Sequence, residues 1–87
     1  MKIVARPVDM IAVFYEGKRP MPWRFRYLDP GGELVTVQVD RVISTEDRRI
    51  AGISTYNYCC QSRIRSEERR YELKYFLKDA RWELYKI

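Results

Sequence analysis

Residues 23–39 read WRFRYLDPGGELVTVQV, and this stretch decides the fold. Apolar and polar side chains alternate on both sides of the central Asp-Pro-Gly-Gly segment, which is the period of two expected of half-buried strands. Asp29, Pro30 and a left-handed Gly32 suit a type I turn followed by a glycine bulge. The stretch therefore predicts a β-hairpin closed by a three-residue loop.

The register of this hairpin follows from its apolar pattern. If Asp29 pairs with Glu33, every inward aromatic ring meets a β-branched residue. The predicted pairs are Tyr27 with Val35, Phe25 with Val37, and Trp23 with Val39. A shift of one residue would place polar side chains opposite the rings and waste the apolar face. We therefore expect Trp23, Phe25 and Tyr27 inside the protein and Arg24 and Arg26 on the outer face.

The C-terminal part of the chain predicts a second hairpin. Residues 71, 73, 75 and 77 share one apolar face, and Trp82 and Leu84 share a face on the last strand. A tight loop at residues 79–80 would pair Leu77 with Trp82 and Tyr75 with Leu84. Upstream, residues 8–15 are mostly apolar at both odd-numbered and even-numbered positions, which is typical of a strand buried on both sides. Residues 17–22 contain two prolines and predict a loop.

The remaining segments complete an all-β expectation. Residues 55–64 predict a further strand, with Tyr56, Tyr58 and Cys60 on one face. Residues 44–50 and 65–70 suit either a charged loop or one turn of helix. The fold class we expect is mainly β. Five or six antiparallel strands would form a strongly bent sheet or small open barrel, with at most one short helical turn, in a single domain spanning residues 1–87.

The charge composition favours anionic partners. The chain contains twelve arginines, five lysines and no histidine, with a formal net charge of +5 and a pI near 9.4. This balance suits nucleic acid, an acidic protein or a membrane surface without choosing among them. No apolar run approaches the ~20 residues of a membrane span, and residues 1–7 lack the apolar core of a secretory signal. We expect a cytoplasmic protein with no membrane partner.

The residue types argue against catalysis and against cofactor binding. No histidine is present to activate a nucleophile, and the four glycines form no phosphate-binding motif. The only cysteines, Cys59 and Cys60, are adjacent, so they provide neither a useful disulfide nor the spacing of a zinc site. We expect Cys60 to point inward and Cys59 to be a half-exposed thiol. The sequence predicts a non-enzymatic protein with no metal and no cofactor.

Nucleic-acid binding has the strongest positive support. Arg24 and Arg26 leave one face of a strand, and Arg63 and Arg65 repeat this spacing. Two such rows on neighbouring strands would form a basic stripe that follows phosphates, as in small open barrels that bind single strands. Tyr15 and Tyr85, at outward parity, are candidates for stacking on bases. Single-stranded or structured nucleic acid is thus the leading partner, although such arginines are also typical of an ordinary solvated strand face.

A protein-interaction module or homodimer is the alternative. Phe76, Tyr85 and Ile87 would form an outward apolar patch near the C-terminus, and a polar rim around it would suit an interface. An unpaired terminal strand could also pair with its own copy across a two-fold axis.

One family resemblance extends over about two thirds of the chain. It rests on Pro22-Trp23-Arg24-Phe25, on the valine-rich strand 35–42, and on residues 70–73 and 77–85, which end in Arg-Trp-Glu-Leu-Tyr. These features resemble a small uncharacterised bacterial β domain that is often encoded beside, or fused to, Y-family DNA polymerase-like proteins. The segment around Tyr56 and Tyr58 departs from that pattern because it lacks tryptophan. The resemblance implies a compact β domain associated with DNA-repair proteins and assigns no functional residues.

Overall fold

The computed structural model describes all 87 residues. It contains seven β-strands joined by turns and loops, and no helix. The strands are β1 (Ile3–Val13), β2 (Met21–Leu28), β3 (Leu34–Gln38), β4 (Arg41–Ile50), β5 (Ile53–Ile64), β6 (Glu67–Phe76) and β7 (Arg81–Lys86). All pairs are antiparallel, and the order across the sheet is β3-β2-β1-β7-β6-β5-β4. The sheet curls into a half-barrel, so the expected fold class is confirmed, with seven strands in place of five or six.

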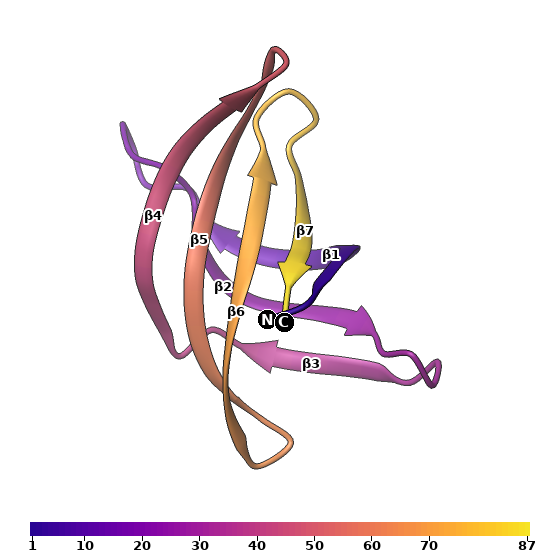
Figure 1. The fold of residues 1–87 in the computed structure, drawn as a ribbon. Coiled ribbons are helices and arrows are strands. Elements are labelled where there is room, and N and C mark those ends of the chain that lie inside the picture. The colour runs from indigo at the N-terminus through magenta and orange to yellow at the C-terminus, as the bar shows by residue number, and fades with distance from the viewer.

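Strand β1 joins the two parts of this sheet. Its first half pairs with β7, as far as Val8 opposite Trp82, and its second half pairs with β2 from Asp9 onward. A bulge in the first half leaves Ala5 at a φ of 44°. In Figure 1, β1, β2 and β3 run across the long, curved strands β4 to β7. The protein core therefore lies between two crossed layers of one continuous sheet.

The core is rich in aromatic rings drawn from both layers. The buried cluster contains Phe25, Val35, Val37, Tyr58, Cys60, Ile64, Tyr71, Leu73, Tyr75, Trp82 and Leu84. The rings of Phe25 and Tyr71 lie 5.5 Å apart across the layers. The hydroxyl groups of Tyr71 and Ser62 lie 2.5 Å apart, which satisfies both of them within the core.

The first hairpin forms in the predicted register. Phe25 lies opposite Val37, Tyr27 lies opposite Val35, and the Asp29 N–H donates to the Glu33 carbonyl at 2.9 Å. The Asp29 carboxylate also accepts the Glu33 N–H at 2.9 Å. Gly32 has a φ of 83°, as the glycine bulge requires.

The predicted burial of Trp23 is wrong. Trp23 is 49% exposed, while the neighbouring Pro22 is buried. The cause is a β-bulge in β2, because Ile11 lies opposite Arg24 whereas the next residue, Ala12, lies opposite Pro22. A bulge inserts one residue into one strand and so reverses the alternation of faces beyond it.

The second hairpin keeps its predicted faces but has a different register. Tyr75 lies opposite Trp82 and Leu73 lies opposite Leu84, so the loop has four residues, 77–80, in place of two. Leu77 consequently leaves the core and is 39% exposed. Because the register is displaced by two residues, the side chains from Tyr71 to Tyr75 and from Trp82 to Leu84 keep their predicted faces.

The regions left open by the sequence are strands. Residues 44–50 belong to β4, and residues 67–70 begin β6. Between β5 and β6 only Arg65 and Ser66 form the turn, with φ of 50° and 67°. These left-handed values at both positions are typical of a type I′ hairpin turn.

The prediction that residues 8–15 are buried on both sides is also wrong. Strand β1 alternates along its whole length, and outward Ile11 and Val13 are 49% and 38% exposed. The predicted loop at residues 17–22 begins earlier, directly after Val13, and ends at Pro20, because Met21 and Pro22 belong to β2. No helix long and apolar enough to cross a bilayer is present.

Candidate functional site

Two clefts open at different places on the half-barrel. The aromatic cleft has a volume of about 690 Å³ and is lined by residues that include Tyr15, Lys18, Arg19, Asp47, Tyr56 and Tyr58. The arginine cleft has a volume of about 600 Å³ and is lined by residues that include Lys2, Arg6, Tyr27, Asp29, Arg65 and Arg69. Tyr56 and Arg65 lie nine residues apart, which corresponds to roughly 30 Å of extended strand. The clefts are therefore separate sites.

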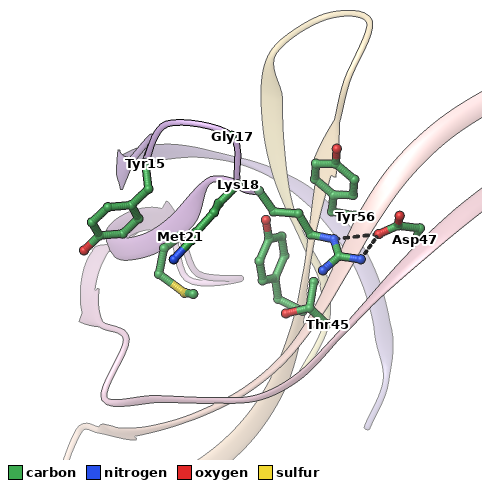
Figure 2. Close-up of a pocket in the computed structure, with 9 residues that line it drawn as sticks. Tyr15, Gly17, Lys18, Met21, Thr45, Asp47 and Tyr56 are labelled. Atoms are coloured by element: carbon green, nitrogen blue, oxygen red, sulfur yellow. Dashed lines mark hydrogen bonds and ion pairs between the residues drawn. The ribbon is translucent and has the colours of Figure 1, made fainter.

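The aromatic cleft holds one ion pair between its own walls. Arg19, from the β1–β2 loop, directs Nε and Nη2 at Oδ1 of Asp47 on β4, and each of these contacts is 2.6 Å. The two dashed lines in Figure 2 mark them. The Arg19 guanidinium also lies 5.4 Å from the ring centre of Tyr56, at the distance of a cation–π contact. Arg19 is thus engaged on two sides, and Lys18 is the remaining cation of this cleft.

Tyr58 forms the buried floor of the aromatic cleft. Its hydroxyl donates to the main-chain carbonyl of Pro20, which ties the β1–β2 loop to β5. Burial raises the pKa of Tyr58 well above its usual range because the phenolate would lose its hydration. Tyr58 is therefore a neutral structural donor at physiological pH and cannot serve as a base.

The β1–β2 loop, which contributes to the aromatic cleft, presents rings to solvent. Tyr15 is 55% exposed and lies in the β1–β2 loop (Figure 2). The preceding residue, Phe14, is 63% exposed and meets the ring of Tyr75 edge-on, with 6.0 Å between the ring centres. The predicted stacking residue Tyr15 is thus accessible, but it lies at the aromatic cleft and not beside the predicted arginine rows.

The arginine cleft gathers cations from distant parts of the chain. Arg6 comes from the inward face of β1 and donates Nη1–H to the Leu28 carbonyl at 2.9 Å. Arg65 comes from the β5–β6 turn, and Arg69 follows it on β6. Lys2 precedes β1, and its main chain exchanges hydrogen bonds with Ile87. The meeting of β1 with β7, and of the two hairpin turns with each other, produces this cluster.

A single carboxylate faces these cations within the cleft. Asp29 accepts Nη2–H of Arg65 at 2.7 Å, and Glu33 lies 3.4 Å from the same nitrogen at the rim. The Arg65 guanidinium lowers the pKa of Asp29, and Asp29 in turn raises the pKa of Arg65. Four cationic side chains therefore line the cleft with one acidic lining residue, which leaves a local excess of positive charge.

Such a concentration of like charge opposes folding unless an anion compensates it. Two unit charges 4 Å apart in water repel by about 1 kcal/mol, and by more where water is partly excluded. Arg6 is half-buried, and its guanidinium is anchored by the hydrogen bond to the Leu28 carbonyl. The arginine cleft has the composition of an anion-binding site, because guanidinium groups bind phosphate through paired N–H donors.

The structure places the four arginines predicted from the sequence on three different elements. Arg24 and Arg26 lie on β2, Arg63 lies near the end of β5, and Arg65 lies in the β5–β6 turn. Arg26 is paired with Asp9 at 2.8 Å, and Arg24 lies over the ring of Trp23 at 5.4 Å. Of the four, only Arg65 lines the arginine cleft.

The predicted apolar patch near the C-terminus is not assembled. Ile87 packs against the core, because a bulge at Tyr85 reverses the faces of β7 beyond Leu84. The ring of Phe76 is covered by Arg81 at 3.8 Å, and the ring of Tyr85 by Lys74 at 3.6 Å. Tyr85 is also only partly exposed, so it offers little free surface for stacking.

The sequence analysis did not predict three cations of the arginine cleft: Lys2, Arg6 and Arg69. For Arg6 a signal existed, because it occupies the inward parity of β1 between Val4 and Val8. A charge at an inward position of a strand marks a place where the core is open or functional. For Arg69 no signal existed, since its position beside Arg6 depends on the long-range pairing of the strands.

The cysteines are free and lie as predicted. Cys60 is fully buried, and burial raises its pKa to about 12, while Cys59 is half-buried. A thiol with so high a pKa is unreactive. No group of three or more histidine, cysteine, aspartate or glutamate side chains is arranged to hold a metal ion. No protein-family model, curated protein or solved structure matches this chain.

Proposed function

We propose that this protein is a non-enzymatic binding domain for single-stranded nucleic acid and that the arginine cleft holds the phosphates. The observation that carries the proposal is the convergence of Lys2, Arg6, Arg65 and Arg69 on a cleft with one acidic lining residue. Three of these side chains are guanidinium groups, which suit phosphate better than ammonium groups do. The net charge of +5 adds long-range attraction for a polyanion.

Tyr27 supplies the aromatic component of the proposed site. It is half-buried in the cleft wall and leans on Phe25, with 6.1 Å between the ring centres. A ring fixed beside guanidinium groups is the arrangement that single-strand binders use, with bases stacked on rings and phosphates on cations. The resemblance to a domain associated with DNA polymerase-like proteins supports the same class of ligand.

The test compares two double substitutions in the full chain. Arg6→Gln with Arg69→Gln removes two charges from the arginine cleft, while Arg24→Gln with Arg63→Gln removes two from the rows predicted by sequence. Binding of a fluorescent single-stranded oligonucleotide is measured by anisotropy at low salt. We expect the first variant to lose affinity by about 10- to 100-fold, because each of the two lost ion pairs with phosphate contributes about 1 kcal/mol in a cleft open to solvent. We expect less than threefold loss in the second.

The Arg24→Gln with Arg63→Gln variant, which also loses two charges, controls for a general effect of net charge, and a single substitution adds a second control. Lys78→Gln lies in the β6–β7 turn, away from both clefts, and should bind as the unmodified protein does. Absence of binding by the unmodified protein at low salt would refute nucleic acid as the ligand. Equal losses in all three variants would refute the arginine cleft as the site.

A further inference from the structure

The two edges of the half-barrel differ in how they are protected. Strand β4 forms one edge and carries Glu46, Asp47, Arg48 and Arg49 together with a bulge between residues 42 and 44. Charged side chains and bulges are the usual means by which an edge strand avoids pairing with another chain. Strand β3 forms the other edge and reads Leu-Val-Thr-Val-Gln, with no charge, no proline and no bulge.

The main chain of β3 has unused hydrogen-bonding groups on its outer side. Glu33 and Val39 bond to β2, through the Asp29 N–H and the Trp23 carbonyl, each at 2.9 Å. Bonding alternates along an antiparallel strand, so residues 33, 35, 37 and 39 face β2. The N–H and C=O groups of Leu34, Thr36 and Gln38 therefore point away from it. No strand pairs with β3 on that side, although β5 crosses close to the C-terminal end of β3 (Figure 1).

We propose that β3 is a dimerisation edge and that its partner is β3 of a second copy of this chain. A two-fold axis normal to the sheet places residues of the same face opposite each other. With the axis at Thr36, the pairs are Thr36 with Thr36, Val35 with Val37, and Leu34 with Gln38. Threonine pairs and β-branched pairs are among the favourable cross-strand contacts. The free main-chain groups lie on residues 34, 36 and 38. The Thr36–Thr36 pair and both Leu34–Gln38 pairs can therefore each exchange two main-chain hydrogen bonds.

Charge does not oppose this pairing, although each copy carries +5. Arg26 lies opposite Thr36 on β2, so in this register the two copies of Arg26 face each other across the seam. Three strand spacings separate them, about 14 Å, which exceeds the Debye length of ~8–10 Å at moderate salt. The acids at the ends of β3 are already engaged, Glu33 with Arg65 and Asp40 with the Arg63 N–H.

The length of β3 sets the expected strength of the dimer. A stable interface buries roughly 800 Å² on each partner, against a total accessible surface here of 6003 Å². Five residues of paired strand bury less than this, even with the exposed Leu34 at the seam. The dimer is therefore weak and concentration-dependent, with a dissociation constant of about 10 μM to 1 mM.

The experiment uses sedimentation equilibrium of the full chain from low micromolar to millimolar concentration. The unmodified protein should change reversibly from monomer to dimer. Thr36→Pro removes an N–H that β2 does not use, so it should leave the monomer folded and abolish the dimer. Thr36→Val keeps a β-branched residue and should keep the dimer. Ser44→Lys on the β4 edge is the control and should also keep it.

A charge swap tests the register independently of folding effects. Thr36→Lys alone and Thr36→Glu alone place like charges opposite each other and should both be monomeric. An equimolar mixture of the two should form a heterodimer, with circular dichroism reporting that each variant is folded. A monomer at millimolar concentration, or a dimer that survives Thr36→Lys, would overturn the proposal. Neither outcome depends on whether the arginine cleft binds nucleic acid.

Discussion

The aromatic cleft and the arginine cleft treat their charges in opposite ways. In the aromatic cleft, Asp47 binds Arg19 through two nitrogens, and the ring of Tyr56 covers the guanidinium. In the arginine cleft, Asp29 binds only Arg65, while Arg6 and Arg69 have no carboxylate partner. In the aromatic cleft one of the two cations is neutralised, whereas the arginine cleft retains most of its positive charge for a ligand. A count of arginines in the sequence cannot distinguish these cases, because the distinction depends on which acids fold beside them.

The largest expected effect concerns stability in alkali. Burial raises the pKa of Tyr58, beneath the aromatic cleft, and of Tyr71 and Cys60 in the core. A raised pKa means that the unfolded chain releases these protons first, at its ordinary values of 9.0 for Cys60 and 10.0 for the tyrosines. Stability is thus full below pH 9 and falls as the pH rises, by up to about 1.4 kcal/mol per pH unit for each group.

Urea unfolding between pH 7 and pH 11 measures this loss. Tyr58→Phe removes one titrating group, so its stability should fall less steeply above pH 10. At pH 7 the same variant should be less stable by about 1–3 kcal/mol, because the Pro20 carbonyl loses its buried donor. Parallel curves for the variant and the unmodified protein above pH 10 would show that Tyr58 does not titrate differently on unfolding.

The second effect compares the clefts as binding sites. Arg6→Gln with Arg69→Gln should weaken oligonucleotide binding by about 10- to 100-fold. Tyr15→Ala with Lys18→Gln alters the aromatic cleft and should weaken binding less than threefold, since neither residue lines the arginine cleft. Competition against one labelled oligonucleotide measures both variants. The reverse ranking would move the ligand site to the aromatic cleft.

The third effect distinguishes the clefts in acid. Arg65 lowers the pKa of Asp29 below its ordinary value of 3.8, so the folded state keeps the carboxylate charged longer than the unfolded chain does. The stabilisation is present above pH 3.8 and is lost as the pH falls through the lowered pKa. Asp29→Asn should therefore flatten the acid limb of a thermal-stability profile between pH 5 and pH 2. An unchanged acid limb would mean that the pair with Arg65 does not persist in solution.

The smallest effect concerns the ion pair of the aromatic cleft. Asp47→Asn removes the partner of Arg19, and both side chains are about half exposed or more. Exposed pairs contribute about 0–1 kcal/mol, so the unfolding free energy should change by less than 1 kcal/mol. The variant also frees Arg19, and oligonucleotide affinity should rise slightly. A loss of several kcal/mol in a chemical denaturation curve would show that the pair holds the β1–β2 loop in place.

Local sequence rules predicted the β-hairpin at residues 23–39 because its turn and its apolar faces agree. The same rules misplaced Trp23 and Ile87, and in both cases a single-residue bulge reversed the alternation. A bulge depends on the partner strand, so the sequence of one strand does not reveal it. The candidate site depends on such long-range pairing as well. Arg65 was predicted on spacing alone, while Arg6 and Arg69 meet only because β1 joins both layers of the sheet.

Salt dependence of binding tests the central claim most directly. Log affinity for a single-stranded oligonucleotide is plotted against log salt for the unmodified protein and for the R6Q/R69Q variant. Three or four phosphates in the arginine cleft predict a slope of roughly −2 to −3 for the unmodified protein, and a slope shallower by about 1.4 for the variant. Identical slopes, or no binding at low salt, would contradict the assignment of the arginine cleft as a phosphate site.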